Sequence, residues 1–507
     1  MRLVMELGGA IAVAALIALP AVARAAESEP IGVFSGQTNV GPAKIPGGAR
    51  FDAETGVYTI EASGTNMWAE RDEFHFVWKQ MKGDFTLRAR VQLLGDGVDP
   101  HRKLGWIVRE TLDADSPYVD VAVHGDGLTS LQFRRSAGAE TEQIQSAVSA
   151  PDVVQISRKA GRYEMAVARF GDTFTTDGLE DVELKDEVYV GLFVCSHNPE
   201  VTETATFRDV RIVVPAPDDL VPYRDYIGSN LEILDVESGD RQIVHQVHDS
   251  LQAPNWTPDG RHLIYNRNGK LYRFELTTRE VTPLDTGFAD RNNNDHVLTF
   301  DGTMLGISHH TEENDGRSIV YTLPASGGTP KKITREGPSY LHGWSPDNRY
   351  LVYTAERGND NYDIYRSPAE GGEEVRLTDH PALDDGPEYT PDGEHIYFNS
   401  TRSGLMQLWR MKPDGSDQEQ VTDDDLNNWF PHLSPDGKRI VFISYRKGDV
   451  DPADHPFYKH VYLRLMPSQG GEAKVIAYVY GGQGTINVPS WSPDGKKVAF
   501  VSNTVME

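Results

Sequence analysis

Short runs in which apolar and polar residues alternate, separated by turn residues, make up most of this chain. In one of them Phe85, Leu87, Ala89 and Val91 occupy every second position, which is the period of a half-buried β-strand. Between residues 51 and 214 no apolar pattern of useful length has the period of a helix. The pattern therefore predicts an all-β fold.

The C-terminal half repeats one short motif six times. Each copy has an aromatic residue or leucine, then Ser or Thr, then Pro or Phe, then Asp, followed by Gly or Asn and an apolar run. The six aspartates are spaced by 42 to 58 residues: Asp259, Asp301, Asp347, Asp392, Asp436 and Asp494. Pro fixes φ and Gly accepts positive φ, so each copy predicts a tight hairpin between the first two strands of a four-stranded blade.

The sixth copy is followed by only one further strand-like run, at 497–500, which leaves its blade incomplete. Two strand-like runs without a motif precede the first copy, at 230–235 and 242–246. A four-stranded sheet of this length buries both faces only by stacking against neighbours. We therefore predict a six-bladed β-propeller over 229–507, closed by strands from both of its ends.

The residues before the repeats divide into four predicted segments. Arg2, the apolar stretch 8–22 and the sequence Ala23-Arg24-Ala25 are typical of a cleaved secretory signal, at 1–25. A Gly/Pro-rich segment at 26–50 is expected to lie across the surface. Short strands at 51–214 predict a β-sandwich, and the prolines of 215–228 predict a linker. The chain is thus expected to be periplasmic or secreted.

Composition narrows the range of partners. The 49 basic residues face 76 acidic ones, for a net charge of −27, which disfavours nucleic acid and anionic membrane surfaces. The single cysteine, Cys195, allows no internal disulfide. No segment after the signal is apolar enough to be a membrane span, so we expect a protein that does not cross the membrane.

Two stretches of the chain resemble known families. The segments 74–80, 83–85 and 191–196 resemble concanavalin-like (laminin-G-like) jelly-roll sandwiches, a fold often used for glycans. The six motif copies resemble TolB-type propellers, and TolB itself binds cell-envelope partners. Oligogalacturonate lyases are also similar, with a TolB-like propeller of seven blades and a histidine-bound metal at its centre. These resemblances imply a carbohydrate or envelope ligand.

A propeller gathers the segments that enter each blade's first strand on the face opposite the motif turns. His296 and His342 lie two residues before their motifs, where the other blades have proline, and His432 lies one residue later. Together with His310 and His460, they predict imidazoles around one channel mouth. Neutral imidazole beside carboxylate suits a divalent ion such as Mn²⁺, Zn²⁺ or Ca²⁺. Hydrogen bonding within a crowded channel is the alternative for each histidine.

Other polar and aromatic residues are expected on the same face. Arg357, Arg402 and Arg446 share one blade position, where a guanidinium binds either a sugar carboxylate or sulfate or the carbonyls of its own loop. The further candidates for ligand contact are Asn294, Tyr340, Trp429, Tyr458 and Asn487. In the sandwich, Trp68, Trp106 and Arg109 are candidates for a glycan surface, although burial is the expectation for Trp106.

Three functions fit these observations. The first is binding of a carbohydrate or envelope ligand at the propeller mouth. The second is metal-dependent cleavage of an acidic oligosaccharide, by a lyase in which His or Arg takes the proton or by a hydrolase that pairs two carboxyl groups. The third is an envelope scaffold that binds proteins. The catalytic candidates are His342, Asp385, Glu388 and Arg402.

Overall fold

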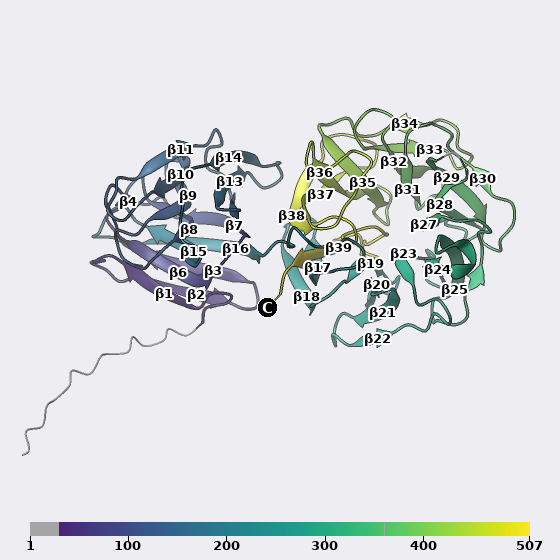
Figure 1. Cartoon of the computed structure of the whole chain (residues 1–507), viewed down its shortest axis with the longest axis horizontal. Coiled ribbons are helices and arrows are strands. Elements are labelled where there is room, and N and C mark those ends of the chain that lie inside the picture. Colours follow the sequence, from purple (N-terminus) through teal and green to yellow (C-terminus); the bar gives the residue numbers. More distant parts are fainter. Residues whose placement is uncertain (1–29, 359, 507) are drawn as a thin grey trace, which may run out of the picture.

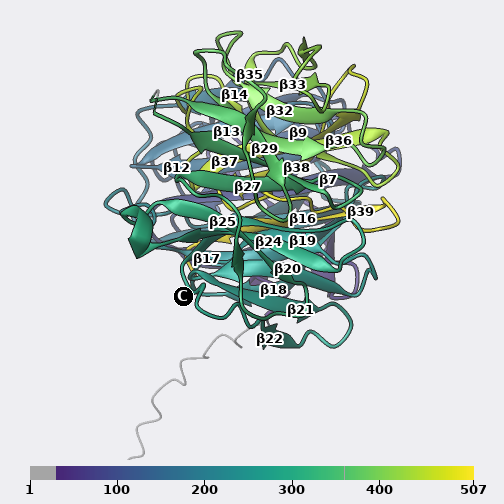
Figure 2. The same cartoon turned by 90° about the vertical axis from the view of Figure 1, so that its right-hand side faces the viewer.

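A computed structural model describes residues 30–358 and 360–506, so the predicted signal at 1–25 lies outside the described residues. The described chain forms two β domains, a sandwich and a propeller, which lie side by side in Figure 1. In Figure 2 the propeller is in front and the sandwich behind it. A 3-10 turn, η1 (Glu312–Asn314), is the only helical element assigned in these residues, and no helix among them is long and apolar enough to span a bilayer. The predicted all-β fold is confirmed.

The N-terminal domain is built from two antiparallel sheets of seven strands each within the described residues. In order across the first sheet, the strands are β1 (Gly36–Val40), β6 (Phe74–Met81), β15 (Val188–Cys195), β8 (Lys103–Arg109), β9 (Tyr118–His124), β10 (Thr129–Arg134) and β11 (Glu142–Gln145). Across the second they are β14 (Thr175–Leu179), β13 (Arg162–Ala168), β12 (Val153–Lys159), β7 (Phe85–Leu94), β16 (Glu203–Val213), β3 (Val57–Ala62) and β2 (Gly48–Asp52). A small hairpin joins β4 (Met67–Trp68) to β5 (Arg71–Asp72).

The segment 26–50, which we expected to lie across the surface, contributes to both sheets. Strand β1 pairs with β6, and β2 pairs with β3. Two polar side chains of β1 hold this segment from within. Asn39 accepts a hydrogen bond from the Gly47 N–H at 2.9 Å, and Gln37 accepts one from the Ala49 N–H at 2.8 Å. Its glycines and prolines masked this pairing in the sequence pattern.

The alternation that predicted strand β7 is the reason that the sandwich has a core. Phe85, Leu87, Ala89 and Val91 all project into one cluster between the sheets, where they meet Trp106 of β8. Burial of such side chains contributes about 1.5–3 kcal/mol each. Trp106 is fully buried, so it cannot belong to a glycan surface.

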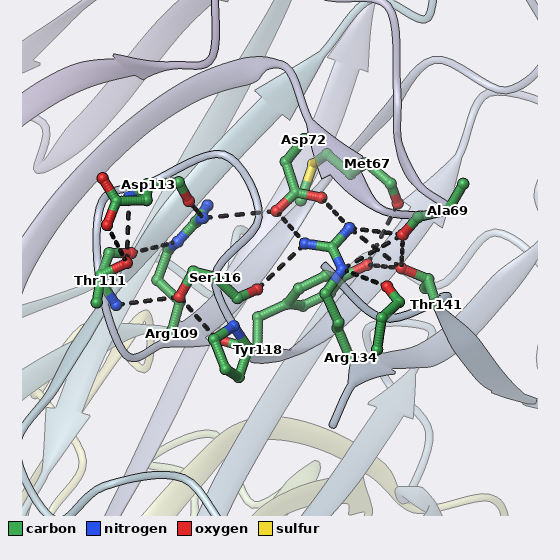
Figure 3. A network of polar contacts seen from close by, with 12 residues as sticks. Met67, Ala69, Asp72, Arg109, Thr111, Asp113, Ser116, Tyr118, Arg134 and Thr141 are labelled. Atoms are coloured by element: carbon green, nitrogen blue, oxygen red, sulfur yellow. Dashed lines mark hydrogen bonds and ion pairs between the residues drawn. The ribbon is translucent and has the colours of Figure 1, made fainter. Parts of the chain in front are cut away.

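A second buried cluster of the sandwich consists of charges rather than apolar groups. Asp72 lies 2.7 Å from Arg134 Nη2 and 3.5 Å from Arg109 Nη2, and none of the three side chains is exposed (Figure 3). Arg134 also donates to the carbonyl oxygens of Ala69 and Ser116, at 2.8 and 3.1 Å. Arg109 therefore ties down loops inside the domain and does not face a glycan, contrary to the sequence-based expectation.

The C-terminal domain is a ring of six sheets in the described chain. Blade 1 contains β19 (Gln252–Trp256), β20 (His262–Arg267), β21 (Lys270–Glu275) and β22 (Val281–Pro283). Blade 2 contains β23 (Asn292–Leu298), β24 (Met304–His310), β25 (Ser318–Pro324) and β26 (Lys331–Lys332). Blade 3 contains β27 (Ser339–Trp344), β28 (Tyr350–Glu356), β29 (Tyr362–Pro368) and β30 (Val375–Arg376). Blade 4 contains β31 (Asp384–Tyr389), β32 (Ile396–Ser400), β33 (Gln407–Met411) and β34 (Glu419–Gln420). Blade 5 contains β35 (Leu426–Leu433), β36 (Arg439–Arg446), β37 (Lys459–Pro467) and β38 (Lys474–Gly481).

Blade 6 joins strands from both ends of the propeller. Strand β17 (Gly228–Asp235) pairs with β18 (Arg241–Val247) on one side and with β39 (Lys497–Thr504) on the other. The innermost position is held by a bridge between Trp491 and Val498. The predicted six-bladed ring, closed by strands from upstream and downstream of the repeats, is confirmed.

The repeated motif is a hydrogen-bonded turn. In blade 3 the Ser345 hydroxyl donates to Asp347 at 2.6 Å and accepts the Tyr350 N–H at 2.9 Å, while Asp347 accepts the Arg349 N–H at 3.1 Å. The same three bonds recur in the other five copies. The residue after the aspartate has positive φ, which is +59° at Asn348, and this explains the usual glycine.

The two domains are joined by packing and by charge. Tyr462 and Tyr478 of blade 5 pack against Val153 and Ala168 of the sandwich. Beside them, a bulge in β16 places Asp209 at φ +49°, where it accepts from Arg241 of the propeller at 2.8 Å. These contacts fix the position of the sandwich against blades 5 and 6.

Candidate functional site

A cavity of about 580 Å³ lies over the hub of the propeller, on the face opposite the motif turns. All six blades contribute to it, and so does the segment that joins the two domains. Its lining is rich in tyrosine, amide and carboxylate side chains: Tyr223, Tyr226, Gln252, Asn266, Asn268, Asn292, Asn293, Asn294, Asp295, Tyr340, Tyr362, Asp385, Gln483 and Asn487. The cavity has the volume of a site for a small polar molecule.

A bulge in the innermost strand of five of the six blades directs residues into this cavity. In β27 the register with β28 shifts between Leu341 and Gly343, and His342 occupies the extra position. Comparable shifts occur in β19, β23, β31 and β35. A bulge adds a residue to one strand only, so it turns side chains that a regular strand would direct into the blade.

His342 and Asp385 form the centre of the site. His342 Nε2 lies 3.3 Å from Asp385 Oδ1, and His455 Nε2 lies 3.7 Å from the other oxygen of the same carboxylate. Burial lowers the pKa of His342, but the charge of Asp295 and the contact with Asp385 outweigh it, so this pKa is raised. Burial acts in the opposite sense on Asp385, and the interaction with His342 overcomes it and lowers its pKa to about 2.

Asp295 is the second carboxylate of the cavity. Burial and the neighbouring Asp385 raise its pKa to about 6, although the charge of His342 opposes the shift. Its Oδ2 accepts a hydrogen bond from Asn293 at 2.7 Å. The two aspartates therefore differ in protonation between about pH 2 and pH 6, and both carry negative charge above about pH 6.

Three of the predicted ligand contacts lie in this cavity. Asn294 and Tyr340 enter it from β23 and β27, and Asn487 enters it from the inner segment of blade 6. Asn487 is held by Gln483 and by the Gly484 N–H, at 2.8 and 2.7 Å. His310 also borders the cavity, with its Nδ1 3.0 Å from the Gly316 oxygen.

The other predicted imidazoles face elsewhere. His296 is fully buried with its Nε2 3.2 Å from the Ile264 oxygen, and burial lowers its pKa to about 4. Its equivalence to His342 fails because the bulge of β23 is larger. Asn292 and His296 are four positions apart, opposite His309 and Ile307, which are only two apart.

His432 lies toward the end of the channel at which the motif turns gather. Its Nδ1 lies 2.6 Å from Glu388, and its Nε2 lies 2.5 Å from the Ile486 oxygen. Glu388 lines a separate cavity of about 310 Å³ among the tryptophans and prolines of the motif turns. Glu388 and Asp385, the two carboxylates suggested for the hydrolase alternative, therefore line different cavities.

The five histidines suggested as ligands of a metal ion do not all lie together in the described chain. Among residues 30–358 and 360–506, no three His, Cys, Asp or Glu side chains form a group that could hold a metal ion. His296 and His432 are engaged by backbone carbonyls or Glu388. His460 lies against Tyr480 at the seam between the domains, where burial lowers its pKa to about 3.

The three arginines of the shared blade position bind carboxylates of their own chain. Arg357 pairs with Glu374 at 2.9 Å, and Arg402 pairs with Asp384 at 2.7 Å. Arg446 pairs with Asp449 at 3.0 Å. None of the three lines the 580 Å³ cavity, and of the described arginines only Arg291 does. Their guanidinium groups fasten loops, as the alternative interpretation of the sequence held.

Two predicted stacking residues are also structural. Trp429 is fully buried and packs edge-on against His455, with ring centroids 4.4 Å apart. The Tyr458 hydroxyl accepts the Ile227 N–H at 3.2 Å, outside the cavity lining. Sequence reasoning missed Asp295 as a site residue, and it missed Tyr223 and Tyr226 altogether. Asp295 could have been found from the polar cluster that enters the first strand of its blade. Nothing in the proline-rich linker indicates that Tyr223 and Tyr226 belong to a site.

Fold and motif turns define the class of this protein, a TolB-like six-bladed propeller with an N-terminal β-sandwich. The family model of the TolB beta propeller domain matches residues 342–455. An uncharacterized protein of Agrobacterium fabrum, Atu1656, is 44% identical over 275 residues, which are 54% of this chain and 92% of that protein. The chain belongs to the same family as Atu1656.

Solved structures agree with this assignment. A candidate TolB from Agrobacterium tumefaciens matches with a TM-score of 0.52 and 43% identity, over 55% of this chain and 99% of that one. Oligogalacturonate lyase from Vibrio parahaemolyticus matches with a TM-score of 0.37 and 14% identity, over 57% of this chain and 92% of that one. The second likeness is too low to support any statement about activity.

Proposed function

We propose that this chain is an exported carbohydrate-binding protein, which holds a saccharide without acidic groups in the cavity at the hub of its propeller. The observation that carries the proposal is the lining of that cavity. Four tyrosines surround a set of amides and two aspartates in about 580 Å³. Aromatic rings offer flat apolar faces, and amides and carboxylates accept and donate hydrogen bonds in the pattern that sugar hydroxyls require.

The charge of the cavity supports a neutral or amine-bearing sugar over a uronate. Asp385 is held ionised by His342, and Asp295 adds a second negative charge above about pH 6. Arg357, Arg402 and Arg446 are paired elsewhere, and Arg291, the described arginine that lines the cavity, lies 3.8 Å from Glu312. A sugar carboxylate placed beside Asp295 and Asp385 would meet charges of its own sign, which costs binding free energy.

Export to the periplasm or the exterior is part of the proposal. It rests on the signal-like sequence of residues 1–25 and on membership of a TolB-like family. A polysaccharide or glycan of the cell envelope is then the accessible source of ligand.

The proposal is tested by calorimetric titration of the purified protein at pH 7.5. The probes are glucose, glucosamine, N-acetylglucosamine and glucuronate, together with cellotetraose, maltotetraose and tetra-N-acetylchitotetraose. We expect at least one neutral or amino sugar to bind and glucuronate not to bind. Binding of glucuronate alone, or of no probe, would overturn the proposal.

Variants then locate the site. Tyr340→Ala and Asp385→Asn should each weaken the bound sugar at least tenfold, because each removes a group from the cavity wall. His248→Ala is the matched control, since His248 is exposed between blades 6 and 1 and does not line the cavity. Equal loss in all three variants, or none in the first two, would place the sugar elsewhere.

A further inference from the structure

The segment between the two domains is a shaped element rather than a slack linker. This strap (residues 216–227) is fastened at both ends to the propeller by tyrosine hydroxyls. The Ala216 N–H donates to Tyr480 at 3.0 Å, and the Ile227 N–H donates to Tyr458 at 3.2 Å. The rings of Tyr458 and Tyr480 are themselves stacked, with centroids 6.5 Å apart. The two tyrosines that bind the ends of the strap therefore also pack against each other.

Hydrogen bonds within the strap fix its central turn. Asp225 accepts the Val221 N–H at 3.1 Å, and its own N–H donates to the Val221 oxygen at 2.9 Å. The Tyr226 hydroxyl donates to the Tyr223 oxygen at 3.2 Å. The turn is thus organised before any ligand arrives.

Tyr223 is held in an unusual state by this turn. Its φ is +64°, a left-handed backbone that costs a side chain with a Cβ about 1 kcal/mol or more. The residue is nevertheless 66% exposed, although it lines the hub cavity. Its ring makes a T-shaped contact with Phe457, with centroids 5.2 Å apart. A strained backbone that presents a large aromatic ring at the rim of a polar cavity is typical of a binding residue.

Tyr226 continues this aromatic rim toward the cavity. It also lines the cavity and contacts the same phenylalanine, with its ring 6.0 Å from Phe457 at 86°. Phe457 is buried and comes from the insertion between β36 and β37, which also supplies His455 to the site. Strap and insertion therefore form one wall, and Tyr340 and Tyr362 belong to the blade that supplies another.

We infer that Tyr223 and Tyr226 are specificity-determining residues, and that the ligand is an oligosaccharide whose end lies in the cavity and whose next unit stacks on Tyr223. This inference rests on the proposed carbohydrate function and goes beyond it. The cavity of about 580 Å³ encloses the end of such a chain, whereas Tyr223 lines the cavity and is 66% exposed. A chain of sugars that leaves the cavity therefore passes the exposed ring.

The experiment compares chain length in wild type and strap variants by calorimetry. Cellotetraose, maltotetraose and tetra-N-acetylchitotetraose are titrated beside glucose and N-acetylglucosamine, with Tyr223→Ala, Tyr223→Phe and Tyr226→Ala. The wild type should bind its preferred tetrasaccharide at least fivefold more tightly than the matching monosaccharide. Tyr223→Ala should weaken binding of the tetrasaccharide at least fivefold and leave binding of the monosaccharide unchanged, and Tyr223→Phe should retain the wild-type affinities. Tyr226→Ala should weaken the tetrasaccharide at least threefold.

Controls separate binding from folding. Val221 is 41% exposed on the same strap but does not line the cavity, so Val221→Ala should leave both affinities unchanged. The melting temperature of Tyr223→Ala should stay close to that of the wild type, because Tyr223 is largely exposed and alanine keeps the Cβ that strains this backbone. Equal affinity of the wild type for mono- and tetrasaccharide, or an unchanged tetrasaccharide affinity in Tyr223→Ala, would overturn the inference alone. Absence of sugar binding by the wild type would overturn the proposed function and this inference with it.

Discussion

Asp295 and Asp385 carry the same side chain, yet their surroundings separate them. Asp385 has an imidazole 3.3 Å away and a pKa of about 2, whereas Asp295 has only an amide partner and a pKa of about 6. His342 lies between the influences of both carboxylates and gains a raised pKa from them. At the residue scale, the pKa values of these three side chains therefore depend on one another, so a substitution at one of them changes the pKa of the others.

Replacing Asp295 by asparagine should make stability less dependent on pH. Because the folded pKa of Asp295 lies above the unfolded value, the wild type loses stability as pH rises from about 4 through 6. Asp295→Asn removes this loss and should gain about 1–3 kcal/mol over the wild type at pH 8, but little at pH 4.5. Urea unfolding at the two pH values measures the difference. The exposed Asp379→Asn should show no such trend, and a variant less stable at pH 8 would contradict the expected sign.

Divalent ions should not stabilise the protein. Of the histidines suggested as ligands, His296 and His432 are committed to carbonyl oxygens or to Glu388. We expect Mn²⁺, Zn²⁺ or Ca²⁺ at 1 mM, or EDTA, to shift the melting temperature by less than about 1 °C, because a bound ion would raise it by mass action. A saturable rise that His342→Ala abolishes would restore a metal to the site.

At the scale of the element, the repeat was readable because it is local. Each motif turn closes within six residues, so the Ser or Thr, Asp and Gly needed for it stand next to one another in sequence. Six such turns at regular spacing, and two strand-like runs upstream, sufficed to predict the ring and its closure. The strands of the sandwich followed from their alternation for the same reason.

Removing one motif aspartate tests what the turn contributes. Asp347→Ala deletes the acceptor for the Ser345 hydroxyl and the Arg349 N–H, at 2.6 and 3.1 Å. We expect a loss of about 1–2 kcal/mol in the free energy of unfolding, measured by urea denaturation. Asp347→Asn keeps an acceptor oxygen and should lose less than half as much. Equal losses would mean that charge, not hydrogen bonding, holds the turn.

The candidate site was less readable because it depends on bulges and on distant segments. His296 and His342 align by motif, but β23 carries a longer bulge than β27, so only His342 reaches the cavity. The arginines shared a blade position, but their carboxylate partners lie up to 18 residues away. Register shifts of this kind leave no periodic trace in the sequence.

Closure of the ring through β39 has a direct test. A chain ending at Lys496 lacks the strand that joins β17 to the inner segment of blade 6. It also exposes the edge of β17 and the apolar cluster around Phe500. We expect the propeller of this truncated chain to be digested by trypsin under conditions in which the full chain resists. A chain ending at Val505 keeps β39 and should behave as the wild type, whereas a resistant chain ending at Lys496 would contradict closure by this strand.

On the scale of the whole molecule, the sandwich and the propeller are held by buried charges as well as by packing. Arg211 of the sandwich pairs with Glu232 of β17 at 2.9 Å, and Arg241 of β18 pairs with Asp209 of the sandwich at 2.8 Å. Burial alone raises the pKa of Asp209, but Arg241 and Arg211 hold it well below its usual value. Glu232 itself is fully buried. Because the strap follows directly after β16, the contacts between the two domains also fix the position of Tyr223.

Neutralising Glu232 should loosen the two domains from each other. Glu232→Gln removes one of the two carboxylates that Arg211 contacts, while Asp209 remains 2.8 Å away, and loss of one such charged hydrogen bond costs about 1.5–3 kcal/mol. We expect a lower melting temperature and faster proteolysis within residues 216–227, seen by mass spectrometry of the fragments. Glu200→Gln breaks an exposed pair with Lys44 and should cost no more than about 1 kcal/mol. A Glu232→Gln protein that melts and is digested like the wild type would show that packing alone holds the two domains together.

The pairing of β17 with β39 sets an order of events during synthesis. The two sheets of the sandwich contain no strand of the propeller in the described residues, so their strands can pair while the ribosome is still translating the blades. The ring has no such freedom, because blade 6 lacks β39 until residue 504 has been made. Until then, the edge of β17 that pairs with β39 in the closed ring is unpaired, and the first motif blade lacks a complete neighbour. A chain of this design therefore spends most of its translation with one finished domain and one open one, and chaperones that shield strand edges have their longest opportunity there.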